Sequence, residues 1–321
     1  MLPERAPATG RGLPGRPAAL VPTGDRTIRA GRRRRNRAGT ILDIMDSTFA
    51  TLVGGPTLLL EIGGVRLLTD PTFDPPGSHA VGSRELIKTE GPAVTADDLG
   101  RIDAVLLSHD QHPDNLDRLG RAVLERVPMV LSTPVAAGRL AGTTRGLRPW
   151  QRETVAGPDD GTVSVTAVPA RHGPPGAESA AGPVTGFWLT TPTGPRIYVS
   201  GDNASLEIVR EIRDRMGRPD MAVLFAGAAR TALLDGAYLA LTSQDAVAAA
   251  RILGAERVSV VHTDGWAHFS QNGATVRDAF DRASLADRLV RLEPGVAQRI
   301  TASGRASPGP DAGAADGVRT R

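Results

Sequence analysis

The sequence predicts an α+β fold, in which strands, hairpins and helices are mixed along one chain. Apolar runs with the length and branching of strands recur, and capping residues or helical spacing mark other segments. The predicted hairpins join residues 57–62 to 65–69 and residues 186–190 to 196–200. Gly63-Gly64 supports the first hairpin, because a tight turn needs residues that tolerate positive φ.

The other elements follow from the same patterns. Residues 162–169 alternate apolar and polar side chains, as a half-buried strand does. Further strands are predicted at residues 104–107, 221–225 and 258–261, and helices after residue 116, near 205–216 and at 242–253. Residues 74–100 are rich in Gly, Pro and polar residues and predict a long surface loop, which makes His79 a loop histidine rather than a metal ligand.

Both ends of the chain differ in composition from its middle. Residues 1–40 are rich in Arg, Pro and Gly, and residues 302–321 in Gly, Ala and Pro, so both predict disordered tails around a single domain at 45–301. Residues 1–39 hold ten of the 38 basic residues and two of the 35 acidic ones, which leaves 28 basic and 33 acidic residues elsewhere. An acidic domain argues against a broad nucleic-acid groove.

The 321 residues include no cysteine, which excludes disulfides, thiolate zinc sites and a cysteine nucleophile. Any metal must therefore be held by nitrogen and oxygen. No apolar run approaches the ~20 residues of a membrane-spanning helix, and the N-terminal arginines precede no apolar signal segment. We expect a cytoplasmic protein without a membrane span. The sequence leaves the oligomeric state open, although an acidic domain of this type can self-associate.

A cluster of histidines and acids lies at residues 102–117, directly after the predicted strand at 104–107. His109, His112 and Asp114 offer imidazole and carboxylate ligands of the kind that zinc and related cations accept. The cluster occupies a strand-to-helix loop, and loops at strand ends commonly carry the chemistry of a rigid scaffold.

Further ligand-type residues also follow predicted strands. His172 and His262 come after the strands at 162–169 and 258–261, and Asp70 and Asp202 come after the second strand of each hairpin. Each residue alone has an ordinary explanation, such as packing or helix capping. Their shared placement predicts one metal site assembled from several strand ends.

In the order Asp70, His109, His172, Gly201-Asp202 and His262, the sequence resembles the metallo-β-lactamase-fold hydrolases, and among them the branch of ascorbate-6-phosphate lactonase. The resemblance covers roughly residues 50–300. It implies a four-layer αββα sandwich, with two mixed β-sheets packed face to face and helices outside. It also implies one metal ion held by His109, His112 and His172, and a second held by Asp114 and His262, with Asp202 bridging and a hydroxide between the ions as nucleophile.

The loop at His109 departs from the family pattern H-x-H-x-D-H. It is one residue longer, and Asn115 stands where the last histidine falls. A gapped alignment keeps His112 and Asp114 as ligands, whereas an ungapped one puts Gln111 in the second histidine position; we prefer the gapped one. An amide oxygen is a weak zinc ligand, so we expect one or two divalent ions, zinc or manganese.

The candidates for catalytic roles are Asp114, Asp110 and His268. His268 follows His262 by six residues, and we expect it to contact substrate, to act as a general acid or to pack behind the site. Asp110 and Asp70 are candidates for orienting the histidine ligands or handling protons, and Asn115 for supporting the metal site.

Three functions compete. The first is a metal-dependent hydrolase that acts on a small-molecule ester, lactone, amide or phosphodiester. The second is a nuclease of the same fold, with the arginine-rich segment guiding nucleic acid; the acidic domain and the few aromatic residues argue against this partner. The third is a metal-binding protein without catalysis, suggested by Asn115.

Overall fold

The computed structural model describes residues 48–300 except Ser83 and Asp159. The predicted tails at 1–40 and 302–321, and the ends of the predicted domain at 45–47 and 301, lie outside the described residues. Within the described ranges, no helix is both long enough and apolar enough to cross a membrane.

The first sheet has seven strands, in the order β15-β1-β2-β3-β6-β7-β8. Strands β3, β6, β7 and β8 run parallel to one another, and the other neighbours are antiparallel. The strands are β1 (Phe49–Gly54), β2 (Thr57–Ile62), β3 (Val65–Thr69), β6 (Ala104–Leu106), β7 (Val130–Ser132), β8 (Thr144–Gly146) and β15 (Ala297–Arg299).

The second sheet has six strands, in the order β14-β13-β12-β11-β10-β9. Strands β12, β13 and β14 are parallel, and the other pairs are antiparallel. The strands are β9 (Arg152–Ala156), β10 (Thr162–Pro169), β11 (Thr185–Thr190), β12 (Ile197–Val199), β13 (Met221–Phe225) and β14 (Arg257–Val261).

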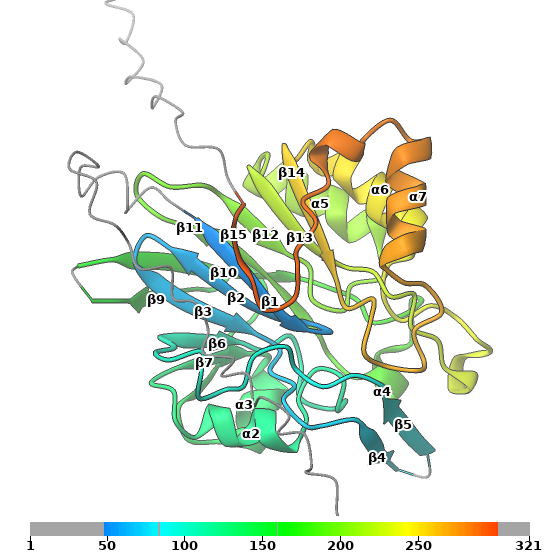
Figure 1. The fold of residues 1–321 in the computed structure, drawn as a ribbon, viewed down its shortest axis with the longest axis horizontal. Helices are drawn as coiled ribbons and strands as arrows, with labels where there is room; N and C mark the ends of the chain where they lie inside the picture. The colour runs from blue at the N-terminus through cyan, green and yellow to red at the C-terminus, as the bar shows by residue number, and fades with distance from the viewer. Residues whose placement is uncertain (1–47, 83, 159, 301–321) are drawn as a thin grey trace, which may run out of the picture. The chain divides into compact units, whose positions relative to one another are not determined.

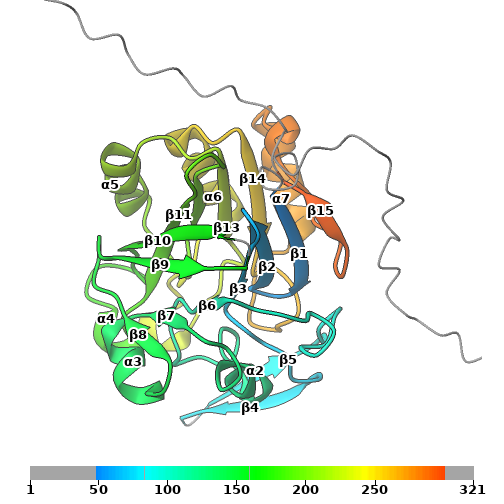
Figure 2. The ribbon, with the colours of Figure 1, turned by 90° about the vertical axis from the view of Figure 1, so that its left-hand side faces the viewer.

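One apolar core lies between the two sheets, where Leu58, Leu60 and Leu67 of the first sheet meet Phe187 and Val223 of the second. Figures 1 and 2 show the blue strands β1 to β3 beside the green and yellow strands of the second sheet. Both faces of each sheet are apolar, which explains why strands such as β13 read as continuous hydrophobic runs.

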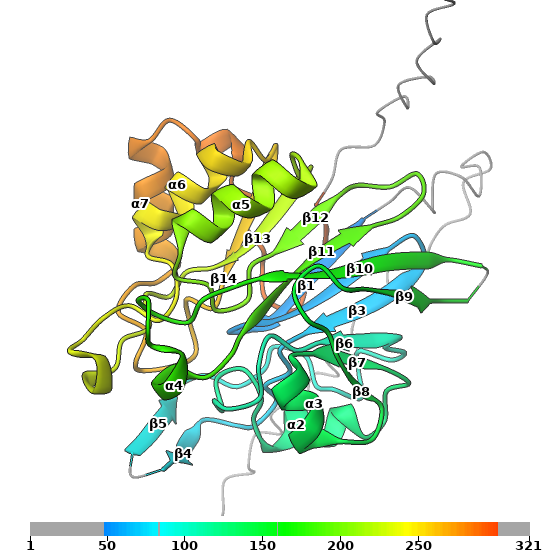
Figure 3. The same ribbon diagram turned by 180° about the vertical axis from the view of Figure 1, so that it is seen from behind.

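Helices cover the outer face of each sheet. Helices α5, α6 and α7 pack on the second sheet and share its outer core (Figure 1), and α2 packs on the first, beside α3 (Figure 3). The helices are α2 (Arg118–Leu124), α3 (Pro134–Leu140), α4 (Glu178–Ala181), α5 (Leu206–Met216), α6 (Ser243–Leu253) and α7 (Gly273–Arg282), with 3₁₀ turns η1 (Ala232–Leu234) and η2 (Ala286–Arg288). The predicted α+β sandwich, with two mixed sheets between helical layers, is confirmed.

The predicted long loop at 74–100 is wrong in its middle. Strands β4 (Gly77–Val81) and β5 (Arg84–Lys88) form a separate two-stranded hairpin, which lies near α4 in Figures 1 and 3. His79 is therefore a strand residue, and its ring lies 5.1 Å from that of Trp266. The hairpin is mostly exposed and rich in Gly, Ser and charged residues, so it lacks the apolar alternation by which a strand is recognised.

Candidate metal centre

The predicted ligand residues all lie at the carboxyl ends of strands from the two sheets. Asp70 follows β3 and His109 follows β6, and these neighbouring parallel strands end at the same edge. In the second sheet, Asp202 follows β12 and His262 follows β14, which are also parallel to β13 between them. His172 follows β10. The two sheets thus each contribute part of one site.

Two of these residues have strained backbones. His262 has φ of +60° and Asp70 has φ of +27°, although neither is glycine. Residues other than glycine seldom adopt positive φ, and such strain is concentrated at functional sites. Gly227 packs against the same turn, since a Cβ at Gly227 would lie 2.1 Å from the carbonyl oxygen of His262. The turn after β14 is therefore held tightly in the conformation that directs His262 inward.

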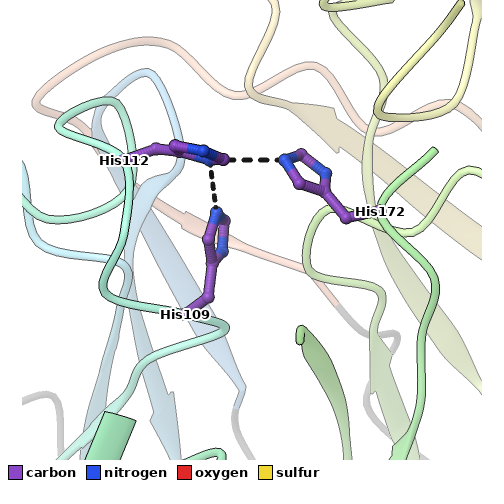
Figure 4. A group of neighbouring side chains, drawn as sticks. All are labelled: His109, His112 and His172. Atoms are coloured by element: carbon purple, nitrogen blue, oxygen red, sulfur yellow. Dashed lines mark hydrogen bonds between the residues drawn. The ribbon is translucent and has the colours of Figure 1, made fainter. Parts of the chain in front are cut away.

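Three histidines form the first group of ligand-type side chains, shown in Figure 4. The Nδ1 atom of His112 lies 3.0 Å from Nε2 of His109 and 3.3 Å from Nε2 of His172. One nitrogen from each ring lies within 4.8 Å of the other two. His109 and His172 are buried and His112 is partly exposed, so the group sits at the bottom of an opening rather than on the surface.

A second group consists of Asp114, Asp202 and His262, all buried, with ligand atoms within 4.8 Å of one another. Nε2 of His262 lies 3.3 Å from Oδ2 of Asp114, and Nδ1 of His262 lies 3.2 Å from Oδ1 of Asp202. Asp202 also reaches the first group, because its Oδ2 lies 3.9 Å from Nδ1 of His172. Asp202 therefore lies beside both groups, although it approaches the His172 nitrogen that contacts Leu239 rather than the one that faces His112.

The contacts in the first group fit ligands that share a cation, and in the second group only one of the two His262 nitrogens can face a given ion. Ligand atoms about 2.0–2.2 Å from one ion and about 90–110° apart lie roughly 2.8–3.6 Å from each other, as Nδ1 of His112 does from Nε2 of His109 and of His172. Both ring nitrogens of His262, Oδ1 of Asp114 and Oδ1 of Asp202 are buried without a hydrogen-bond partner in the described part of the chain. Buried polar atoms normally have partners, so these atoms are candidates to bind divalent metal ions, with one nitrogen of His262 for a given ion.

Hydrogen bonds from neighbouring residues fix the orientation of two histidines. The hydroxyl of Ser108 donates to Oδ2 of Asp70 at 2.6 Å and lies 2.9 Å from Nδ1 of His109. Because the Ser108 proton is used on Asp70, its oxygen accepts from Nδ1–H of His109, which leaves Nε2 as the ligand atom. Likewise, Nδ1 of His172 donates to the carbonyl oxygen of Leu239 at 2.8 Å, which leaves its Nε2 facing His112.

The pKa values of His109 and His112 in the first group are shifted in the opposite direction to that of His262 in the second. Burial and the neighbouring imidazoles hold the pKa of His109 well below its usual value, and burial also lowers the pKa of His112. These rings are therefore neutral, as metal ligands must be. Burial lowers the pKa of His262, but the carboxylates of Asp202 and Asp114 outweigh it and raise that pKa overall. Without a metal, the second group thus favours a histidinium.

Two carboxylates at the site have shifted pKa values in opposite directions. Burial raises the pKa of Asp70 to about 7, although Ser108 and Asn115 donate hydrogen bonds to it. Burial would also raise the pKa of Asp114, but His268 and His262 outweigh this effect and hold the pKa well below its usual value. Asp114 is therefore the anionic member, and Asp70 the carboxyl group that gains or loses a proton near neutrality.

The structure distinguishes the two alignments of the loop after β6. His112 joins His109 and His172, whereas the side chain of Gln111 packs against Gly182, where an added Cβ would lie 2.1 Å from its Nε2. His112, and not Gln111, is thus the residue of this loop that lies with His109 and His172. The amide nitrogen of Asn115 points to Asp70 rather than to the candidate ligands, since Nδ2 donates to Oδ2 of Asp70 at 3.0 Å.

Asp110 does not take the orienting role expected of it. Its carboxylate accepts hydrogen bonds from Nε of Arg139, at 2.8 Å, and from Nη2 of the same guanidinium. Arg139 lies in α3, so this ion pair ties the loop to the outer helix. A carboxylate engaged by a guanidinium on both oxygens is a structural support for the loop rather than a partner of a histidine ligand.

An apolar pocket lies over the two groups. His112, Asp114, His172 and His268 face it from the metal centre, and its walls come from the β4–β5 hairpin, α4 and the segment around η1. The wall residues include Val81, Leu86, Ala181, Leu234 and Leu239, with Arg84 and Arg230 also lining the pocket. The hairpin that sequence patterns did not predict is therefore one wall of this pocket.

Sequence patterns also gave no indication of the supporting residues. Ser108 and Leu239 contact ligand histidines, and Leu239 does so through its backbone carbonyl, which no side-chain pattern reveals. The sequence places Ser108 between the predicted strand and His109, but it does not reveal the role of the hydroxyl group. A hydroxyl beside a histidine ligand becomes recognisable only once Asp70 is placed next to it.

Comparisons with known proteins identify the family. Residues 65–263 match the model of the beta-lactamase superfamily domain. The chain is 29% identical over 187 residues to the uncharacterized protein Rv0906 of Mycobacterium tuberculosis (strain ATCC 25618 / H37Rv), covering 57% of this chain and 49% of that protein. It is 25% identical over 195 residues to N-acyl-phosphatidylethanolamine-hydrolyzing phospholipase D 1 of Caenorhabditis elegans, covering 56% and 54%. The chain spans about half the length of these relatives.

Several solved structures share the fold. The isothiocyanate hydrolase from Delia radicum gut bacteria superposes with a TM-score of 0.66 at 19% identity, over 79% of this chain and 100% of that one. Igni18, a metallo hydrolase from Ignicoccus hospitalis, gives 0.57 at 19% identity over 78% and 97%. CmlA, a diiron β-hydroxylase from Streptomyces venezuelae, gives 0.57 at 16% identity over 79% and 54%. Since the family model also matches more than half of the 321 residues, this chain belongs to the beta-lactamase superfamily.

Proposed function

We propose that this protein is a metal-dependent hydrolase of small molecules. His109, His112 and His172 would hold one divalent ion, and Asp114, Asp202 and His262 a second, with Asp202 between them. The observation that carries this proposal is the pair of ligand groups, each with its atoms within 4.8 Å, beside one pocket that residues of both groups line. Histidine and carboxylate ligands suit zinc and manganese alike.

Bound divalent ions polarise a carbonyl or phosphoryl oxygen and lower the pKa of water from ~15.7 to about 7. The protein's own residues prepare the site for this chemistry. Ser108 and the Leu239 carbonyl fix which nitrogen of His109 and His172 faces inward. Asp114 stays ionised, and His112 and His268 line the pocket where a substrate would enter.

The pocket supports a substrate with an apolar part and an anionic group. Its walls are mostly aliphatic, and Arg84 and Arg230 line it as well. Arg84 donates from Nη1 to Oγ1 of Thr231 at 2.6 Å, so the hairpin and the segment around η1 meet across the pocket. An ester, lactone, amide or phosphodiester of this kind fits; the phospholipase D relative supports a phosphodiester, and the resemblance to ascorbate-6-phosphate lactonase supports a lactone carrying a phosphate.

The test is elemental analysis of the purified protein together with the His112→Ala and Gln111→Ala variants. We expect about two metal ions per chain, loss of metal in His112→Ala, and no loss in Gln111→Ala, which is the matched control in the same loop. Metal-loaded protein should then hydrolyse members of an ester, lactone and phosphodiester panel. Absence of bound metal after reconstitution with zinc or manganese would refute the proposal.

A further inference from the structure

We propose that His268 is the imidazole ligand of the second metal ion, in place of the histidine that Asn115 replaces in the H-x-H-x-D-H pattern. This inference rests on the proposed function, because it assigns an additional ligand to the ion held by Asp114, Asp202 and His262. It gives the departure at Asn115 a structural compensation 153 positions along the chain.

Asn115 itself is committed to another task. Its side chain is fully buried, and its Nδ2 donates to Oδ2 of Asp70, which in turn holds Ser108 and through it His109. The amide therefore supports the first group of ligands. Its Oδ1 is the competing candidate for the second ion, since that atom has no hydrogen-bond partner in the described residues.

The position of His268 fits the vacant role. Its Nε2 lies 3.0 Å from Oδ2 of Asp114, and Nε2 of His262 lies 3.3 Å from the same oxygen. The histidines of the first group have the same spacings around Nδ1 of His112, 3.0 and 3.3 Å. Two imidazole nitrogens that converge on one carboxylate oxygen at these distances are arranged as neighbouring ligands of one ion.

Neighbouring aromatic rings hold the His268 ring in place and leave its nitrogens free of other hydrogen-bond partners in the described residues. The ring packs on Phe269, with centroids 4.6 Å apart, and near Trp266, at 6.2 Å. Its Nδ1 is buried without a hydrogen-bond partner in the described part of the chain, and Nε2 contacts Asp114 alone among the hydrogen bonds found there. His268 lines the pocket, so it approaches the second group from the substrate side.

The experiment titrates metal-free protein with manganese and follows free Mn²⁺ by electron paramagnetic resonance. The variants are His268→Ala and the more conservative His268→Gln. The glutamine variant fills more of the volume of the histidine and serves if the alanine variant does not fold. His79→Ala is the matched control, because His79 also packs on Trp266, at 5.1 Å, but lies on the hairpin away from Asp114. Asn115→Ala tests the competing amide oxygen.

We expect the wild type and His79→Ala to bind two ions per chain. His268→Ala and His268→Gln should keep one ion at wild-type affinity and bind the second at least about tenfold more weakly. The visible spectrum of the cobalt-substituted protein should change in the second equivalent alone, which a merely structural role would not produce. Asn115→Ala should affect the first ion instead, through Asp70.

Two unchanged affinities in both His268 variants would overturn the inference, as would loss of the second ion in Asn115→Ala alone. A wild type that binds a single ion would overturn it too, while leaving a mononuclear hydrolase. A wild type that binds no metal would refute the proposed function itself, so the two failures are distinguishable.

Discussion

Nζ of Lys88 lies 2.9 Å from Oδ2 of Asp117, and both side chains are buried. The pair joins the end of the β4–β5 hairpin to the start of α2, where Asp117 caps the helix by accepting from the backbone N–H of Gly120. Asp117 also accepts from the backbone N–H groups of Phe73 and Asp74. One carboxylate thus holds the helix, the chain after β3 and the pocket wall together.

This network predicts that the two partners differ in importance. Asp117→Asn should lower the free energy of unfolding by about 3–5 kcal/mol, because it leaves Lys88 charged and buried without a counterion and weakens several backbone contacts. Lys88→Met should cost less, since Asp117 keeps its three backbone donors. Urea denaturation of the metal-free proteins measures both.

The exposed pair Arg126–Asp97 is the matched control for this measurement, with side chains that are 56% and 83% exposed. Asp97→Asn should change the free energy of unfolding by about 0–1 kcal/mol. An equal loss in Asp97→Asn and Asp117→Asn would contradict the assignment of Asp117 as a central support.

Two helix glycines give a second prediction, in which the same change to alanine has opposite effects on the free energy of unfolding. A Cβ at Gly120 in α2 would lie 1.8 Å from the carbonyl oxygen of Pro71, a backbone atom. Gly120→Ala should therefore destabilise the protein by about 3 kcal/mol or more, because the helix must move away. Gly138 in α3 has no atom within 4 Å of the same position, so Gly138→Ala should stabilise by about 0.5–1 kcal/mol. Thermal denaturation of both variants checks the signs, and stabilisation by Gly120→Ala would show that α2 does not pack this closely.

Ser108→Ala should weaken metal binding without unfolding the protein. Alanine keeps the Cβ that packs close to Gly201 but removes the hydroxyl between Asp70 and His109. Losing such an orienting contact typically costs about 10- to 100-fold in metal affinity. Competition with a chelator measures the affinity, and circular dichroism tests the fold. Unchanged affinity would mean that packing alone fixes the His109 ring.

The metal-free protein should lose stability as the pH rises from about 5.5 to 8. The pKa of Asp70 is about 7 in the folded protein against the usual 3.8, so folding favours its protonated form and its contribution is lost between these values. This amounts to about 2 kcal/mol between pH 5.5 and 7. The raised pKa of His262 acts in the same direction, since its contribution is present below 6.5 and is lost as the pH rises through the raised pKa.

Denaturant titrations at several pH values measure this slope, and Asp70→Asn should flatten it. Metal affinity should show the opposite trend at the second group, because His262 must release a proton to bind an ion. A metal-free protein that becomes more stable towards pH 8, with the same slope in Asp70→Asn, would refute the assignment to Asp70.

Local patterns in the sequence were enough to predict many of the strands and the strand-end positions of the candidate ligands, whereas the sandwich was predicted from the resemblance to a known family. Strands such as β2 and β10 are long and apolar or alternating, and ligand residues follow strands because parallel strands end together. The β4–β5 hairpin was missed because its strands are polar and exposed. The roles of Arg139 toward Asp110 and of Asp70 toward Asn115 join residues 29 and 45 positions apart, so they depend on packing that no local pattern encodes.

The candidate ligands are divided between the sheets, since His109, His112 and Asp114 follow a strand of the first sheet and His172, Asp202 and His262 follow strands of the second. Bound ions would therefore connect the two sheets at the edge where these strands end. The side chains that fill the core between the sheets, such as Leu60 and Phe187, set the distance between the two sheets that each contribute ligands. We therefore expect their volume to influence metal affinity, even though neither side chain belongs to either group of candidate ligands.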